Sequence, residues 1–267
     1  MQTNEKVIAL GVGRKGCQTV NNMLSKKIEG VEFVGLRFNV EPEVLDLFDI
    51  PLKFNVENAE ECKKVISKNF NDADIIFVIG DSPLAPYVAK SAKEAEILTI
   101  SIVPINNGAL KEMLKENSDA LISFDENIFW DEQIKLSQNV VESIVNLITK
   151  SGFVNLDFRD IKAVLQDTGT ALFGTGHAEG DNRAEIAALQ AVNMCGEEIK
   201  QAKRILLNIT TGNEVSLSEM SDAAGVVEET CDPDAQIIWG HVIDENLENS
   251  VKVTFIAGME DKVSVSV

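Results

Sequence analysis

In the first half of the chain, short runs of apolar residues alternate with segments of helical spacing, and this alternation limits the possible folds most strongly. The runs are continuous rather than interrupted by polar residues, which is typical of strands buried on both faces. Strands separated by helices indicate right-handed parallel crossovers. We therefore predict an α/β fold with a doubly wound, mainly parallel sheet, whose strands cover residues 7–13, 31–39, 50–55, 74–80, 97–104 and 119–127.

A long helix is expected next, from Asp131 to Gly152. Apolar residues between Ile134 and Ile148 fall near helical spacing, and Gly152 provides a C-terminal stop. At about 1.5 Å per residue, such a helix is roughly 30 Å long and can join two domains. We therefore expect an N-terminal domain, a central helix and a C-terminal domain, over residues 1–130, 131–151 and 152–267.

The second half has the pattern of an α+β domain with a mainly antiparallel sheet. A helix is expected after Asp181 as its N-cap, and another begins at Ser216, where Glu219 completes a capping box. The last two strands, residues 236–247 and 250–260, are separated by a short acidic turn, which predicts a hairpin. Two further strands are expected over residues 169–180 and 203–212.

The charge and the cysteines exclude several classes of protein. Lys and Arg total 24 and Asp and Glu total 43, so the net charge is −19, which disfavours nucleic acid and anionic lipid as partners. Four scattered cysteines and two histidines do not form a zinc pattern, and they fit a reducing cytoplasm. We find no signal peptide and no apolar run of membrane-spanning length, so we expect a cytoplasmic protein without a metal.

The loop GVGRKG contains Gly11, Gly13 and Gly16 between a predicted strand and a predicted helix. This context suits a phosphate at a helix N-terminus, with Arg14 and Lys15 as positive charges. The same glycines would also serve a tight strand-to-helix turn. A nicotinamide dehydrogenase would need an acidic residue at the tip of the second strand, where Asn39 stands.

Three stretches of the second half resemble FtsZ, the bacterial and archaeal relative of tubulin. The resemblance extends over essentially the whole chain and is strongest from Asn155 onward. It implies a nucleotide-binding domain, a long central helix and a C-terminal α+β domain. The stretches are GFVNLDFRDIKAVLQDTGTALFGTGHAEGDNRAEIAA (152–188), LLNITTG (206–212) and DPDAQIIWGHVIDENL (232–247).

The resemblance implies that each subunit holds GTP and that an acidic loop, Asn-x-Asp-x-x-Asp, from the next subunit completes the hydrolytic site. Asn155, Asp157 and Asp160 match that loop in type and spacing. Carboxylates can orient an attacking water near a phosphate. The same residues also suit a helix N-terminus, with Asp157 as the cap and Asp160 beyond it near the positive end of the helix dipole. The two interpretations are compatible.

The sequence departs from the family in the segments that would hold GTP. Where the family carries Gly-Gly-Gly-Thr-Gly-Thr-Gly, this chain has GDSPLAP. Pro83 and Pro86 have no N–H to offer a phosphate, and Asp81 adds a negative charge. FNVENAEECKK lacks the family's next glycine-rich loop, VPINNG replaces a Lys-Pro-Phe segment, and Lys135 stands near the position of a guanine-reading aspartate.

These observations favour an FtsZ-like cytoskeletal, cell-division-type protein that has lost GTP binding and hydrolysis and so needs no cofactor. It would act through assembly with FtsZ or itself by the face of the acidic loop, and could cap an FtsZ filament. The alternative is a divergent polymerising GTPase that binds GTP in a rebuilt pocket. Three further hypotheses remain. The N-terminal domain could have decayed without keeping a role, Arg14 and Lys15 could bind a different phosphate ligand, or the protein could be a dinucleotide-dependent oxidoreductase.

The chain ends on VSVSV, just after the last strand of the family. The resemblance would imply a linker and a peptide that docks membrane tethers beyond this point. We therefore expect no direct membrane binding.

Overall fold

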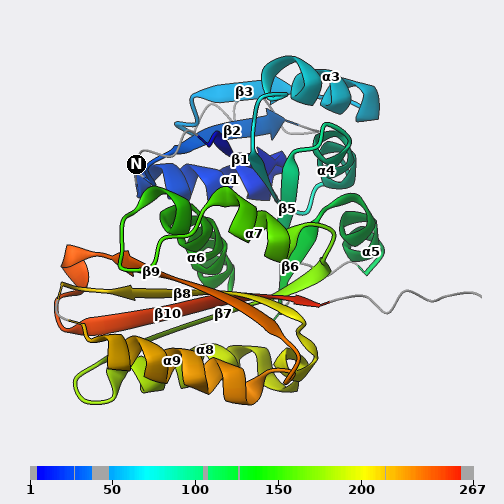
Figure 1. Cartoon of the computed structure of the whole chain (residues 1–267). Coiled ribbons are helices and arrows are strands. Elements are labelled where there is room, and N and C mark those ends of the chain that lie inside the picture. Colours follow the sequence, from blue (N-terminus) through cyan, green and yellow to red (C-terminus); the bar gives the residue numbers. More distant parts are fainter. Residues whose placement is uncertain are drawn as a thin grey trace, which may run out of the picture. The chain divides into compact units, whose positions relative to one another are not determined.

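A computed structural model of the chain divides into two compact units, Met1–Val145 and Asn146–Val267, which are described separately (Figure 1). Three features of the sequence analysis lie outside the described residues: Asn39, the centre of VPINNG and the VSVSV end. The structure describes residues 5–26, 28–37, 48–104, 108–125, 127–213 and 215–259.

Parallel strands form the sheet of the first unit, in the order β3-β2-β1-β4-β5-β6 (Figure 1). In the central strands β1 and β4 every residue is buried, as their continuous apolar sequences predict. The prediction of a doubly wound parallel sheet is confirmed. The strands are β1 (Val7–Val12), β2 (Val31–Arg37), β3 (Leu52–Asn55), β4 (Ile75–Ile79), β5 (Leu98–Pro104) and β6 (Ala120–Phe124).

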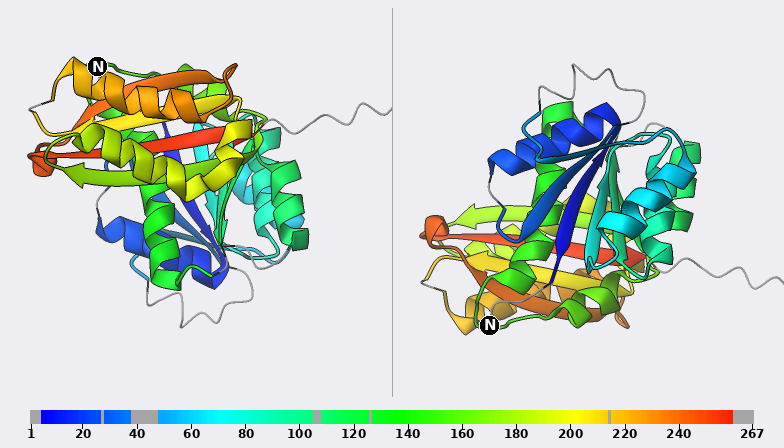
Figure 2. Two further views of the ribbon diagram at one scale, coloured as in Figure 1. Left: turned by 90° about the horizontal axis from the view of Figure 1, so that it is seen from below. Right: turned by 90° about the horizontal axis from the view of Figure 1, so that it is seen from above.

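Helices cover both faces of this sheet (Figure 2). Helix α1 (Gly13–Ser25) packs on β1 and β2, whereas three helices pack side by side on the opposite face. These are α3 (Ala59–Asn69), α4 (Ala85–Glu94) and α5 (Gly108–Asn117), and they enclose an apolar core with the strands.

The predicted central helix is confirmed as α6 (Trp130–Thr149), which crosses the boundary between the units in the sequence. It begins one residue before the expected start and ends before Gly152. Val140, Ile144 and Val145 are fully buried, which accounts for the apolar spacing. Among the described residues, no helix combines the length and the apolar character needed to cross a membrane.

The second unit has a mixed sheet in the order β7-β10-β8-β9. Strand β10 is antiparallel to both β7 and β8, whereas β9 runs parallel to β8. Helices α8 (Arg183–Cys195) and α9 (Leu217–Thr230) lie beside each other against this sheet, and α7 (Phe158–Leu165) precedes it in sequence (Figure 1). The strands are β7 (Gly169–Glu179), β8 (Arg204–Thr211), β9 (Gln236–Ile243) and β10 (Ser250–Met259).

The predicted hairpin between the last two strands is wrong. Strand β10 does not pair with β9 but inserts between β7 and β8. Nearly all residues of β10 are buried, so it belongs in the middle of the sheet, whereas β9 is only partly buried and has β8 as its one neighbour in the described sheet. The turn after β9, including the short 3-10 helix η2 (Glu245–Leu247), therefore carries the chain past β8.

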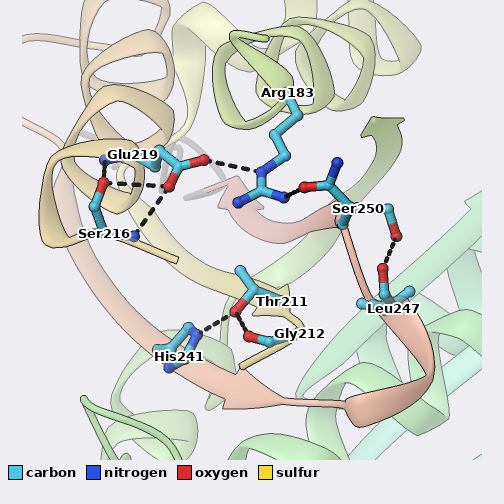
Figure 3. Close-up of polar contacts among 9 residues, drawn as sticks. Arg183, Thr211, Gly212, Ser216, Glu219, His241, Leu247 and Ser250 are labelled. Atoms are coloured by element: carbon cyan, nitrogen blue, oxygen red, sulfur yellow. Dashed lines mark hydrogen bonds and ion pairs between the residues drawn. The ribbon is translucent and has the colours of Figure 1, made fainter. Parts of the chain in front are cut away.

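The expected caps of α8 and α9 have different outcomes. Ser216 and Glu219 form the predicted capping box of α9. Asp181 is not the N-cap of α8, because Asn182 takes that position in a left-handed conformation (φ 56°) without a side-chain cap bond. Instead, the guanidinium of the nearly buried Arg183 donates to Glu219 and Asn249 and joins the starts of α8 and α9 to the turn before β10 (Figure 3).

Candidate functional site

The predicted glycine loop lies at the carboxyl ends of β1 and β4. Gly11 is in β1, Gly13 begins α1 and Gly16 lies in the first turn of α1, so the structure brings the three residues together. The chain leaves β1 and β4 toward opposite faces of the sheet, which makes this the switch point where open α/β sheets hold their ligands.

Close packing of the backbone accounts for these glycines without a ligand. A Cβ atom at Gly16 would lie 2.1 Å from the carbonyl oxygen of Ile79, and one at Gly11 would lie 2.6 Å from the backbone of Gly16. Gly13 has a φ of +75°, which disfavours any other residue. The tight-turn interpretation of GVGRKG therefore explains all three positions.

The segment that leads into α4 lies against the glycine loop, since a Cβ atom at Gly13 would be 3.0 Å from Ser82 Cβ. We call the place where these two segments meet the crevice. The amides at the start of α4 bond within their own segment. Leu84 N–H donates to the Ser82 hydroxyl, 3.3 Å away, and Ala85 N–H donates to the Ser82 carbonyl, 2.9 Å away. The amides of Tyr87 and Val88 both donate to the Leu84 carbonyl. Pro83 and Pro86 have no N–H. A phosphate cradle needs amides that turn inward together, and residues 83–88 use theirs internally.

An ion pair joins the two segments. Lys15 Nζ lies 2.8 Å from a carboxylate oxygen of Asp81 and 5.5 Å from the centre of the Trp130 ring at the start of α6. The side chains of Lys15 and Asp81 are 54% and 36% exposed, so the pair contributes at most about 1 kcal/mol. The position of this ion pair bears on phosphate binding more than its strength does. Lys15, a residue expected to attract phosphate, is paired with the Asp81 carboxylate instead. These residues do not fit a triphosphate.

The acidic loop belongs to the second unit, and its side chains bond to the loop itself. Asn155 accepts from Gly152 N–H at 2.9 Å. Asp157 caps α7 by accepting from the amides of Arg159 and Asp160, and Asp160 accepts in return from Asp157 N–H. The helix-cap interpretation is therefore confirmed, but the expectation that Asp160 lies beyond the cap is wrong. Asn155 and Asp157 remain exposed, and Asp160 is half-buried.

The acidic loop rests on a buried histidine that the sequence analysis did not single out. His241 Nδ1 lies 3.1 Å from Phe153 N. The Nε2 atom of His241 lies 2.9 Å from the Thr211 hydroxyl (Figure 3). The Thr211 hydroxyl is also 2.8 Å from the Gly212 carbonyl. Because Phe153 N–H can only donate, Nδ1 is the acceptor, so the neutral ring carries its proton on Nε2. Burial lowers the pKa of His241 below its ordinary value.

Two other features of the described residues are a polar hollow and the cysteine thiols. Arg183, Glu219 and Asn249 line an open hollow of about 580 Å³, and their polar groups bond to one another. Burial raises the pKa of Cys17 and of Cys195 to about 12, so neither thiol is a ready nucleophile. No group of His, Cys, Asp and Glu within the described parts of the chain could hold a metal ion.

Comparison with known proteins finds FtsZ as the protein to which this chain is similar. Residues 169–260 match the family "FtsZ family, C-terminal domain". The cell division protein FtsZ of Caulobacter vibrioides is 27% identical over 98% of this chain and 61% of its own length. An FtsZ mutant from M. jannaschii has a TM-score of 0.80 at 27% identity, covering 95% of this chain and 91% of that one. This chain is similar to FtsZ along nearly its whole length, and residues 169–260 match the C-terminal domain of that family.

The FtsZ relatives agree in fold over both units. An empty FtsZ dimer from M. jannaschii has a TM-score of 0.81 at 27% identity and covers 96% of this chain and 88% of that one. CetZ1 from Haloferax volcanii, a GDP-bound monomer, shares the fold at 15% identity, with a TM-score of 0.75 over 97% of this chain and 96% of its own. The chain spans less than two thirds of the Caulobacter FtsZ.

The packing around Gly16 predicts a large loss of stability on adding one methyl group. Gly16→Ala should lower the free energy of unfolding by at least about 2 kcal/mol, because the Ile79 carbonyl cannot move out of the sheet. Gly225→Ala is the matched control, since nothing lies within 4 Å of its Cβ position in α9, and it should stabilise by up to about 1 kcal/mol. Chemical denaturation measures both, and equal stability of the two variants would contradict the packing explanation.

The His241 network predicts that stability falls at mildly acidic pH. A second proton on the ring would place a donor against Phe153 N–H. Since the folded pKa lies below the ordinary value of 6.5, the contribution is fully present above about pH 6.5 and is lost as the pH falls through the folded pKa, with a slope of at most about 1.4 kcal/mol per pH unit. Denaturation of wild type and His241→Asn between pH 7.5 and about 5 should show this slope only in the wild type.

The control for this experiment is the exposed His177. His177→Asn should keep the slope of the wild type. A slope that disappears in His177→Asn but persists in His241→Asn would contradict the assignment.

Proposed function

We propose that this FtsZ-like chain has lost GTP binding and hydrolysis and acts by assembly, through the acidic loop, on an FtsZ subunit. The observation that carries this proposal is the hydrogen bonding at the start of α4. There the amides of Leu84, Ala85, Tyr87 and Val88 donate within the segment. The proposal divides the chain into a degenerate nucleotide-binding-like domain (1–130), a central helix (131–151) and an FtsZ/tubulin-like domain (152–267).

The charges of the crevice support the loss of GTP binding. Asp81 stands in the segment that would meet phosphate, and a like charge about 4 Å from a phosphate costs roughly 1 to 4 kcal/mol. Lys15 compensates Asp81 rather than an added anion. Gly11, Gly13 and Gly16 then act as packing residues.

The acidic loop supports a role on a neighbouring subunit. Asn155 and Asp157 are exposed on a loop whose conformation is set by bonds to backbone amides. An exposed carboxylate held in this way, as in Asp157, can orient water near a phosphate that another subunit supplies. A chain with this loop would complete the hydrolytic site of one FtsZ subunit. Without its own nucleotide, it could not accept another subunit on its nucleotide face, so it would act as a filament cap. A second copy of this chain is the other partner open to this face, and one similar solved structure is an empty FtsZ dimer from M. jannaschii.

A divergent polymerising GTPase is the second candidate. The observation that favours it is the exposed Arg14 beside Gly13 in the first turn of α1, where a phosphate could lie without using α4. GTP-dependent sedimentation of the purified chain would select this candidate over the first.

The cap predicts an effect on filaments that depends on the charge of the acidic loop. Sub-stoichiometric wild type should shorten filaments of a polymerising FtsZ and raise GTP turnover per filament end. The variant Asp157→Asn with Asp160→Asn should need at least about tenfold more protein for the same shortening, because charge-assisted contacts are worth roughly 1.5–3 kcal/mol. Electron microscopy and phosphate release measure the two effects.

The design of this variant preserves the helix cap. Asn is as good an N-cap as Asp, and an Asn at position 160 keeps an oxygen for Asp157 N–H. The free energy of unfolding should therefore change by no more than about 1 kcal/mol. Equal potency of wild type and variant, or no effect of either at concentrations equal to FtsZ, would refute the cap and leave the loop with a structural role alone.

A further inference from the structure

The segment before the acidic carboxylates is clamped to strand β9 by His241. The backbone N–H of His241 donates to the Val154 carbonyl at 2.9 Å, and Ile243 N–H donates to the Ser151 carbonyl at 3.3 Å. Between them the His241 ring accepts from Phe153 N–H. Gly152 lies so close that a Cβ atom there would be 1.7 Å from the His241 carbonyl oxygen. The clamp leaves this segment little freedom to move.

The histidine ring is itself held in place from the other side. Thr211 in β8 accepts from Nε2–H and passes its own hydrogen to the Gly212 carbonyl. His241 and Thr211 are each 1% exposed. Because every polar atom of the ring has a partner, rotation of the ring would break a buried hydrogen bond. The orientation of the ring is therefore transmitted to the Phe153 amide.

The side chain of Phe153 is exposed although it is held. Its ring stacks on the His241 ring with centroids 5.1 Å apart and an angle of 21° between the planes, yet 60% of Phe153 is exposed. Exposure alternates along the segment, so that Phe153, Asn155 and Asp157 are exposed while the residues between them are half-buried. An aromatic ring already fixed in one orientation loses little entropy on binding, which is typical of an interface anchor.

We propose that His241 is the positioning residue of the acidic loop, and that Phe153, held on its ring, is the apolar anchor by which the loop contacts the FtsZ subunit. The proposal rests on the proposed function for its partner. Beyond the proposed function, this proposal places the carboxylates of Asp157 and Asp160 on a segment whose conformation is fixed, beside the ring of Phe153. His241 contacts no partner in this account and acts through Phe153.

Two variants of His241 test the positioning role in the free protein. His241→Asn places an amide oxygen near the Nδ1 position, where it can accept from Phe153 N–H, whereas His241→Gln places its amide near Nε2 and leaves Phe153 N–H without an acceptor. Amide hydrogen exchange followed by NMR should show at least about tenfold faster exchange of Phe153 in His241→Gln and recovery of protection in His241→Asn. The Leu207 amide in β8 serves as the reference for global unfolding.

Two variants of exposed apolar residues test the anchor. Phe153→Ala should weaken binding to FtsZ filaments at least about tenfold, as truncation of a central anchor does. Leu217→Ala is the matched control, because Leu217 is 71% exposed at the start of α9, and it should change binding less than about twofold. Co-sedimentation with FtsZ over a concentration series measures both.

The outcomes separate this inference from the proposed function. Unchanged Phe153 exchange in His241→Gln, with an unchanged Leu207 reference, overturns the positioning role. Equal binding of Phe153→Ala and Leu217→Ala overturns the anchor. Absence of binding by wild type overturns the proposed partner and the anchor together, while the exchange measurement still decides the role of His241. If His241→Gln does not fold, amide hydrogen exchange at positions 152 and 153 is measured in Phe153→Ala instead. Faster exchange there would support the view that the stack of Phe153 on His241 holds the segment, and unchanged exchange would overturn it.

Discussion

The close approach of the β1–α1 turn to the end of β4 sets the geometry of the first unit. Gly16 lies against the Ile79 carbonyl. The start of α1 can approach β4 this closely only because position 16 carries no side chain. The same contact brings Lys15 within reach of Asp81 across the crevice. In this chain, contacts within the protein occupy the place where the two segments meet. The geometry of the turn is thus accounted for by packing and hydrogen bonds of the chain itself.

The second unit depends on a different constraint, which is the satisfaction of polar groups where loops meet the sheet. Asn155, Asp157 and Asp160 each accept from a backbone amide, so the residues that match the family's acidic loop also determine the local structure. Their contribution to the stability of the loop would be a sufficient reason for the chain to keep these residues, even without a partner. The exposure of Asn155 and Asp157, and the fixed Phe153 beside them, are the features that point beyond stability to a partner.

Much of the fold could be predicted from the sequence because it follows from local pattern. The parallel strands of the first unit are continuous apolar runs, and the capping box at Ser216 is formed by residues three positions apart. Pairing between distant strands is not encoded locally, and the acidic turn before Ser250 therefore predicted a hairpin where β10 in fact inserts between β7 and β8. Asp181 lost its expected cap role because Asn182 took a left-handed conformation beside the anchored Arg183.

In the candidate site, too, features set by local sequence could be predicted, whereas contacts between distant residues could not. The loss of N–H donors at Pro83 and Pro86 follows from chemistry and was predictable. The pairing of Lys15 with Asp81 joins residues far apart in the sequence, and the only sign of it was the opposite charge of two loops expected at one edge of the sheet. No motif marked Trp130 or His241, although each belongs to a residue type that occurs only twice in the chain. Their roles depend on contacts that only the folded chain brings together.

The claim that the crevice does not hold GTP is tested most directly by the guanine nucleotide bound to the folded protein. Purified chain would be dialysed to equilibrium against micromolar GTP with magnesium, then denatured, and the released nucleotide measured by chromatography. This detects nucleotide retained from the cell as well as nucleotide taken up. Our account predicts far less than one nucleotide per chain from protein that remains folded by circular dichroism. A value close to one nucleotide per chain would contradict it and select the divergent GTPase.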